Sequence, residues 1–339
     1  MQTLMHNVVP SDFGVRASRT SPIIIATDGL DQSNSAMLVG RLLATTPEAM
    51  RLVTVVKPLP IVSAEAPAPA PEEVEASRRV DRWLSVEAQS TRVWGGHVAD
   101  IDIGEGDPAA ILARLARETN ATMIVSGLGR HRVVDRLFGD ETALRLVRVS
   151  TVPVFAVANG ASQLPARIVV AVDFSETSLR AARLALEIAA PRATVYLAHV
   201  GPRDSMLREW NGWGTTYKNE VRVALESMRK QLSVPAGTSV QCVMLQGDPA
   251  TELLAFASTV GADAIATGSH GHGFITRMIV GSVTTRILRC ATCSVLCVPY
   301  AAAMTHVPMD VAPVMFREPH RLAWSKPFGG RVPRSLARP

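Results

Sequence analysis

The sequence predicts an α/β protein made of two tandem doubly wound domains, each a five-stranded parallel sheet with helices on both faces. The first reason is an internal repeat. The run IIIATD at 23–28 returns as IVVAVD at 168–173, and GDPA at 106–109 returns at 247–250. The second reason is that strand-length apolar runs alternate with helical patterns, which is typical of a parallel sheet buried on both faces.

The second domain shows the strand and helix order most clearly. Apolar runs predict strands at 168–172, 194–200, 239–245, 263–267 and 295–299, and the stretches between them predict helices at 175–190, at 213–233, from 249 and from about 282. Asp248 suits a helix N-cap and Pro249 the first helical position. Parallel strands of this kind end at one edge of the sheet, so we expect Asp173, Val200 and Gly268 to lie together there.

Composition limits the class of protein. The chain has 339 residues, 47% of them hydrophobic and 19% charged, with a net charge of +5, which describes a globular protein of about two domains. No apolar run reaches the roughly 20 residues that span a bilayer. Residues 1–20 lack a secretory pattern, so we expect a cytoplasmic location. No basic and aromatic nucleic-acid motif is present, so neither membrane nor nucleic acid is expected as a partner.

The repeat sets the expected domain boundaries. They are an N-terminal tail at 1–20, a first domain at 21–158, a linker at 159–165, a second domain at 166–300 and a tail at 301–339 that is rich in Pro and Arg. The C-terminal tail has no lasting periodicity, so we interpret it as an extended appendage. Binding of a partner protein by this tail is the alternative.

Three of the four cysteines form a C-x2-C-x3-C pattern at Cys290, Cys293 and Cys297. Thiolates at this spacing can share a metal centre. However, Cys297 falls within the apolar run SVLCV, and buried cysteine behaves as a small hydrophobic residue. We therefore predict no metal site, with ligation as the alternative.

A glycine-rich segment carries the strongest functional signal. Gly268 and Gly271 are followed, after nine residues, by Gly281, Ser282, Val283 and Thr284. Glycine permits close backbone approach to a ligand, and a helix that begins near Ser282 would direct its positive dipole end toward a phosphate. The order of strand, glycine loop and helix start therefore predicts a phosphate-binding loop.

This segment resembles the ATP-binding motif of the universal stress protein family, G-x2-G-x9-G-(S/T), at every defined position. The resemblance extends over about residues 21–300, as in a tandem member of the family. It implies the strand order 3-2-1-4-5 in each domain. It also implies an internal pseudo-dimer in which the fifth strands, at 152–157 and 295–298, meet. A homodimer of whole chains is a further possibility that it raises.

The resemblance also implies a set of nucleotide contacts. Asp173, next to Val172, would contact the nucleoside, and the backbone at Val200 would face adenine. The phosphates would be held by Thr267, Gly268, His270, Gly271, Gly281, Ser282, Val283 and Thr284, and Mg²⁺ would accompany ATP. The residues themselves leave an alternative for Asp173, because an Asp after a strand commonly caps a helix or begins a turn. His270 could likewise be a simple loop residue.

The first domain departs from this pattern. It has Gly127 and Gly129, but Arg130 stands where the second glycine is required, and Asp140 and Glu141 align with Gly281 and Ser282. A shift by one residue recovers Gly139 as the glycine but leaves Asp140 at the hydroxyl position. A carboxylate repels a triphosphate. We therefore expect the first domain to be a degenerate partner with a structural or regulatory role.

Three functions remain open at this point. The resemblance implies an ATP-binding stress-response regulator that acts through nucleotide-dependent association with an unknown protein partner, with no catalytic residue. The alternatives are a slow ATPase and a nucleotide-free interaction module. Enzymes that cleave ATP between its α- and β-phosphates carry a Ser-Gly-Gly-x-Asp-Ser loop after the first strand, whereas this chain has Asp-Phe-Ser-Glu at 173–176.

Overall fold

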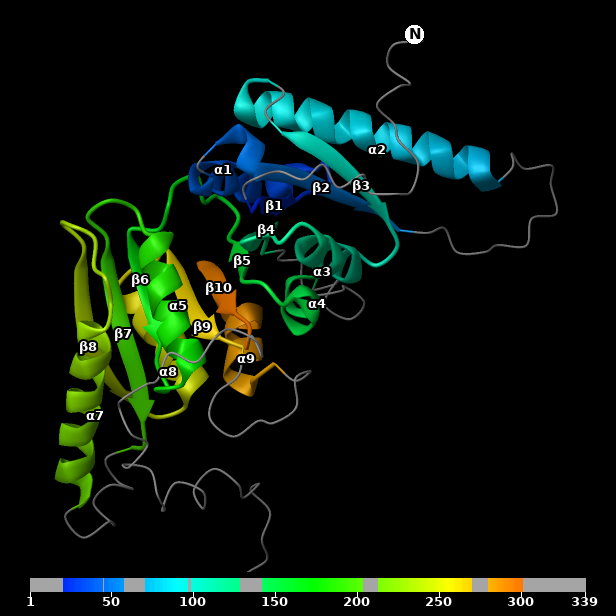
Figure 1. Ribbon diagram of the computed structural model, residues 1–339. Coiled ribbons are helices and arrows are strands. Elements are labelled where there is room, and N and C mark those ends of the chain that lie inside the picture. Colours follow the sequence, from blue (N-terminus) through cyan, green and yellow to red (C-terminus); the bar gives the residue numbers. More distant parts are fainter. Residues whose placement is uncertain are drawn as a thin grey trace, which may run out of the picture. The chain divides into compact units, whose positions relative to one another are not determined.

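The computed structural model describes residues 21–44, 46–57, 71–96, 99–128, 142–203, 213–269 and 280–300 (Figure 1). In the first half, the strands are β1 (Ile23–Ala26), β2 (Met50–Val56), β3 (Asp100–Glu105), β4 (Met123–Gly127) and β5 (Val154–Val157). The helices of this half are α1 (Asn34–Leu43), α2 (Pro71–Trp94), α3 (Pro108–Glu118) and α4 (Thr142–Val149), with short 3₁₀ turns at Asp31–Ser33 and Pro47–Ala49.

The second half repeats this plan. Its strands are β6 (Arg167–Ala171), β7 (Thr194–Gly201), β8 (Ser239–Gln246), β9 (Ala264–Gly268) and β10 (Ser294–Val298). Its helices are α5 (Glu176–Glu187), α7 (Trp213–Lys230), α8 (Pro249–Thr259) and α9 (Ser282–Cys290). These bounds lie close to those expected from the sequence, except that α5 and α7 each end three residues before the expected 190 and 233. The predicted α/β class is confirmed.

The strands form one sheet in the order β3-β2-β1-β4-β5-β10-β9-β6-β7-β8. Each half alone has the expected order 3-2-1-4-5, and its strands are parallel. The halves therefore do not keep two separate sheets. They join edge to edge into a single ten-stranded sheet.

The junction between the halves is an antiparallel pair of β5 and β10. Leu296 lies opposite Phe155, and Cys297 lies opposite Val154. The hydroxyl of Ser294 also accepts a hydrogen bond from the Ala158 N–H, at 3.1 Å. The expected meeting of the two fifth strands is confirmed, and neither β5 nor β10 is left as an open sheet edge.

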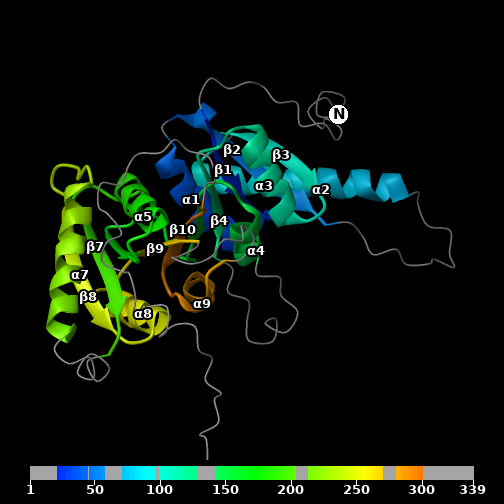
Figure 2. The same cartoon turned by 60° about the horizontal axis from the view of Figure 1, so that its bottom comes forward.

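Helices cover both faces of each half. In the second half, α5 and α7 pack on one face, and α7 runs alongside β8 in both views (Figure 2). Helices α8 and α9 pack on the other face. The central strands β6, β9 and β10 are mostly buried, with β10 buried along its whole length, whereas the edge strand β8 is only partly buried. This explains why the sequences of the central strands are continuous apolar runs rather than alternating patterns.

Helix starts follow the predicted chemistry. Asp248 caps α8 by accepting a hydrogen bond from the Thr251 N–H, at 3.0 Å, with Pro249 at the first helical position. Asp107 and Pro108 repeat the arrangement at α3. Within the described residues, no helix combines the length and the apolar character needed to cross a membrane.

Candidate functional site

The ends of β6, β7 and β9 converge at the point where the strand order reverses. Strand β6 is flanked by β9 on one side and β7 on the other. The chain leaves β6 toward β7 and later returns to the opposite side as β9. Ligands of doubly wound sheets bind at such a switch point, beyond the carboxyl ends of the strands. Asp173 follows β6, Val200 lies near the end of β7, and Gly268 ends β9. The fold thus brings these three positions to one edge.

Asp173 forms a tight turn that starts α5. Its Oδ1 accepts hydrogen bonds from the Ser175 N–H at 3.0 Å and the Ser175 hydroxyl at 2.5 Å, and Ser175 in turn caps α5. The interpretation of Asp173 as a turn residue is therefore correct. However, both of these hydrogen bonds are accepted by Oδ1. The half-buried carboxylate keeps Oδ2 without a partner among the described residues, and this oxygen can accept hydrogen bonds from a ligand.

An aromatic and imidazole cluster, absent from the sequence-based site, lies beside Asp173. His199 is next to Val200 on β7, and its Nδ1 lies 2.8 Å from the Val172 carbonyl oxygen. The Nε2 of His199 lies 3.1 Å from the hydroxyl of Tyr217 on α7. Phe174 packs its ring on His199 at a centroid distance of 4.8 Å. Because a carbonyl only accepts, Nδ1 donates its proton to Val172, and this fixes the backbone after β6.

The position of Tyr217 also explains why residue 201 is a glycine. Tyr217 is buried, with 8% of its surface exposed, and a Cβ atom at Gly201 would lie 2.8 Å from its hydroxyl oxygen. Glycine at the end of β7 therefore lets α7 approach this edge of the sheet. Burial raises the pKa of Tyr217 to about 12. The only sequence signal for this cluster was a polar residue, His199, near the end of an apolar strand.

Two threonines link β9 to α9. Thr267 and Thr284 are both buried, and their hydroxyl oxygens lie 3.1 Å apart. The Thr284 hydroxyl also donates to the Gly268 carbonyl oxygen at 2.7 Å. These bonds hold the first turn of α9 against the end of β9. Both threonine hydroxyls are therefore engaged within the protein.

The N-terminus of α9 lies at the same edge. Its N-cap residue, Gly281, supplies no side chain to the N–H groups of the first turn, whereas Ser175 and Asp248 cap α5 and α8. The Gly281 N–H donates to the Ser269 carbonyl at 2.8 Å. Ser282 is exposed and Val283 half-buried. A helix start of this kind offers N–H donors and a positive dipole end to an anion. His270 and Gly271 lie outside the described residues.

At the corresponding edge of the first half, a polar network joins α2 to the turn after β1. Gln89 of α2 is fully buried and donates to the Leu30 carbonyl oxygen at 2.6 Å and to Asn34 Oδ1 at 2.8 Å. Its Oε1 accepts from the hydroxyl of Thr27 at 2.6 Å. Thr27 occupies the position that Val172 has in the second half. Its hydrogen bond to Gln89 connects α2 to the end of β1. Gly129, Arg130, Gly139, Asp140 and Glu141 lie outside the described residues.

The three cysteines of the C-x2-C-x3-C pattern differ in burial. Cys290 is exposed, Cys293 half-buried and Cys297 buried within β10. In the part of the chain that the structure describes, no group of three or more His, Cys, Asp or Glu side chains is placed to hold a metal ion.

Comparison with known proteins identifies the fold family. The sequence model of the Universal stress protein family matches the chain twice, over residues 20–158 and 166–299. The chain belongs to the universal stress protein family. Among curated members, a universal stress protein of Methanocaldococcus jannaschii is 33% identical over 138 residues, which are 39% of this chain and 81% of that protein. A universal stress protein of Bacillus subtilis, YxiE, is 28% identical over 145 residues, 39% of this chain and 97% of that protein.

Solved structures agree at the level of the fold. A universal stress protein from Archaeoglobus fulgidus superposes with a TM-score of 0.59 at 19% identity, covering 82% of this chain and 96% of that chain. The superposed length covers most of the chain, consistent with two universal stress protein domains in tandem.

Proposed function

We propose that the second half binds one molecule of ATP and that the chain is a cytoplasmic stress-response regulator acting through nucleotide-dependent association rather than catalysis. One observation supports this most. The α9 N-terminus, which has no capping side chain, and the unpartnered Oδ2 of Asp173 lie at the same edge of one parallel sheet, beyond the strand ends. An anion binder and a hydroxyl acceptor at one switch point suit a phosphorylated nucleoside.

Each residue has a role in this proposal. The Oδ2 of Asp173 accepts from a ribose hydroxyl, and the backbone at Val172 and Val200 borders the base. The N–H groups of Gly281, Ser282 and Val283 face the phosphates, together with the loop that contains Gly268, His270 and Gly271. Thr267 and Thr284 act indirectly, because their hydroxyls hold α9 in place.

The residues present fit a triphosphate at α9. Gly281 has φ of −56°, which any residue can adopt, so its conformation does not demand glycine. Among the described residues, an added Cβ there would meet the Ser269 carbonyl oxygen, at 3.5 Å. Packing against the described residues therefore does not require glycine here, and access for a ligand is the reason that the proposal gives for it. A divalent cation would take its ligands mainly from phosphate oxygens and water, and the exposed Ser282 hydroxyl could serve as a protein ligand.

Nucleotide retention tests the proposal. The full chain is purified without added nucleotide, denatured by heat, and the released small molecules are identified by mass spectrometry. We expect an adenine nucleotide in the wild type and none in Gly281→Asp. No released nucleotide, together with no binding of added ATP, would favour the nucleotide-free interaction module instead.

A further inference from the structure

A cavity in the first half lies between helix α2 and the ends of β1 and β2. Its volume is about 350 Å³. Asp28 and Leu30 of the turn after β1 line one side, and Val56 at the end of β2 lines another. Helix α2 supplies the rest, with Arg78, Asp81, Arg82 and Ser85. A volume at the small end of the range for ligand sites suits a compact metabolite.

The wall made by the β1 turn is held firmly against α2. Gly29 has φ of +78°, and a Cβ atom on it would lie 2.6 Å from the Ser85 hydroxyl oxygen. Glycine is therefore required both by the backbone conformation and by the close approach of α2. Arg82 donates to the Asp28 carbonyl oxygen, and Ser85 donates to the Gly29 carbonyl oxygen at 3.3 Å.

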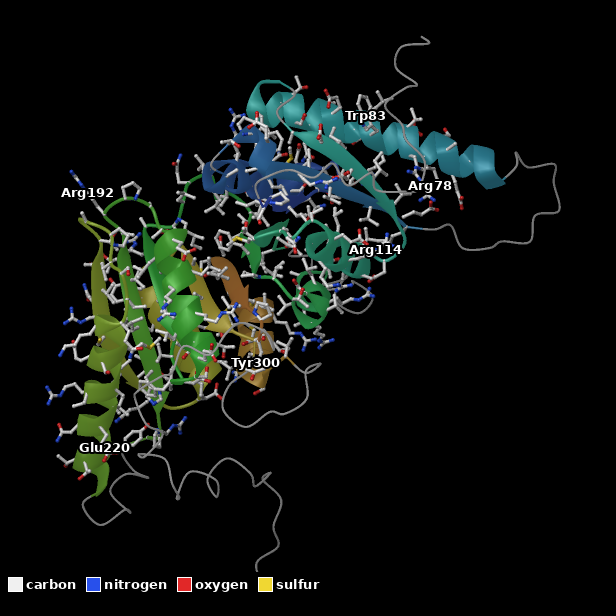
Figure 3. All side chains as sticks on the ribbon, viewed as in Figure 1. Arg78, Trp83, Arg114, Arg192, Glu220 and Tyr300 are labelled. Carbon is white, nitrogen blue, oxygen red and sulfur yellow. The ribbon has the colours of Figure 1, made fainter. Side chains whose placement is uncertain are left out.

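The charged groups of the cavity are incompletely paired. Arg78 and Arg82 are four residues apart and so share one face of α2. Figure 3 shows Arg78 on the side of α2 that faces the strand ends. Arg78 is half-buried and has no hydrogen bond or ion pair among the described residues. Asp28 uses Oδ1 for the Leu30 N–H and the Ser33 hydroxyl, which leaves Oδ2 without a described partner.

This lining differs from the second half in chemistry. There, helix α7 presents Tyr217 to His199 at the strand ends. Here, α2 presents two guanidinium groups. The glycine positions that would face a triphosphate from the β4 side are also replaced in the first half by Arg130 and Asp140. Among the described residues, the positive charge that lines this cavity comes from α2, which packs on β2 and β3, on the opposite side of β1 from β4.

We propose that this cavity binds a small phosphomonoester of a polyhydroxy compound, separately from the nucleotide of the second half. Arg78 and Arg82 hold the phosphate, because a guanidinium matches phosphate oxygens with paired N–H donors. The carboxylates of Asp28 and Asp81 accept hydrogen bonds from the hydroxyls. A free sugar phosphate and a nucleoside monophosphate both have this chemistry.

Calorimetric titration of the full chain tests the site, with ribose 5-phosphate and AMP as probes. We expect at least one of the two to bind, and binding to weaken by about tenfold or more in Arg78→Ala, since one charge-assisted contact is lost. Arg117 of α3 is exposed and lines no described cavity, so Arg117→Ala is the matched control and should bind as the wild type does.

The two probes and a second variant separate the outcomes. Binding of ribose 5-phosphate that Arg78→Ala weakens assigns the site to sugar phosphates. Binding of AMP alone, again weakened in Arg78→Ala, assigns it to nucleoside monophosphates. In Gly281→Asp, which alters only the second half, binding of the probe should persist. The proposal is overturned if neither probe binds, if Arg78→Ala binds as well as the control, or if Gly281→Asp abolishes probe binding.

Discussion

The hydroxyls of Thr267 and Thr284 form a direct link, 3.1 Å long, between the end of β9 and the first turn of α9. Thr284 extends it to the Gly268 carbonyl oxygen. In the first half, Ser126 aligns with Thr267, and Thr284 aligns with Ala143 in the ungapped register or with Thr142 after the shift by one residue. The Ser126 hydroxyl is buried there and has no partner among the described residues. Among the described residues of the first half, Ser126 therefore does not form the link that Thr267 forms in the second half.

Thr284→Val should destabilise the protein. The substitution keeps the shape of the side chain but removes its hydroxyl, so the Gly268 carbonyl and Thr267 each lose a buried hydrogen bond. We expect a loss of about 1–2 kcal/mol in the free energy of unfolding, measured by urea denaturation. Thr285→Val is the control, because no described hydrogen bond involves the Thr285 hydroxyl. Equal losses in the two variants would contradict this account of the link.

Gly281→Asp should abolish tight ATP binding while the fold is retained. A side chain fits against the described residues at this position, where a Cβ would meet the Ser269 carbonyl oxygen at 3.5 Å. The added carboxylate would face the phosphates, and two unit charges about 4 Å apart interact by roughly 4 kcal/mol near a protein surface. We expect affinity to fall by about 100-fold or more, with an unchanged circular dichroism spectrum. Gly281→Ala, which adds bulk without charge, separates the two effects and should bind more tightly than Gly281→Asp.

Tyr217 should make the protein less stable at alkaline pH. Burial raises its pKa to about 12, above the value of about 10 in the unfolded chain. Between these values the unfolded state loses the proton and the folded state keeps it, so stability is full below pH 10 and falls as the pH rises toward 12. From pH 8 to pH 11 the wild type should lose roughly 1 kcal/mol more than Tyr217→Phe. The same loss in both proteins, by urea denaturation, would be the contrary result.

Hydrolysis of bound ATP should be very slow. Positioned acid–base groups accelerate such reactions by about 10²–10⁴-fold, and the proposed roles include no general base. We expect no multiple turnover on the scale of minutes, and little effect of His270→Ala on any residual rate. Rapid steady-state hydrolysis that disappears in His270→Ala while ATP binding persists would support the slow ATPase alternative.

The backbone could be predicted from the sequence because the repeat and the apolar runs are local signals. The start of α8 at Asp248 and Pro249 followed from cap chemistry alone. The pairing of β5 with β10 followed from the family resemblance. The sequences of the two strands alone do not indicate which strand each one pairs with.

Contacts between side chains of different helices and strands could not be predicted from the sequence. Tyr217 meets His199 through the packing of α7 on β7, and no spacing in the sequence encodes that distance. Arg78 and Arg82 lie on a helix rich in charge, and such residues usually form a solvated face. The folded structure shows instead that this face lines a cavity.

The stoichiometry of ATP binding tests the central claim most directly. The full chain is titrated with ATP and Mg²⁺ in a calorimeter, in the wild type and in Gly281→Asp. One tight site per chain in the wild type and none in the variant is the predicted result. Two equivalent sites per chain, or a site that persists unchanged in Gly281→Asp, would contradict the assignment of nucleotide binding to the second half.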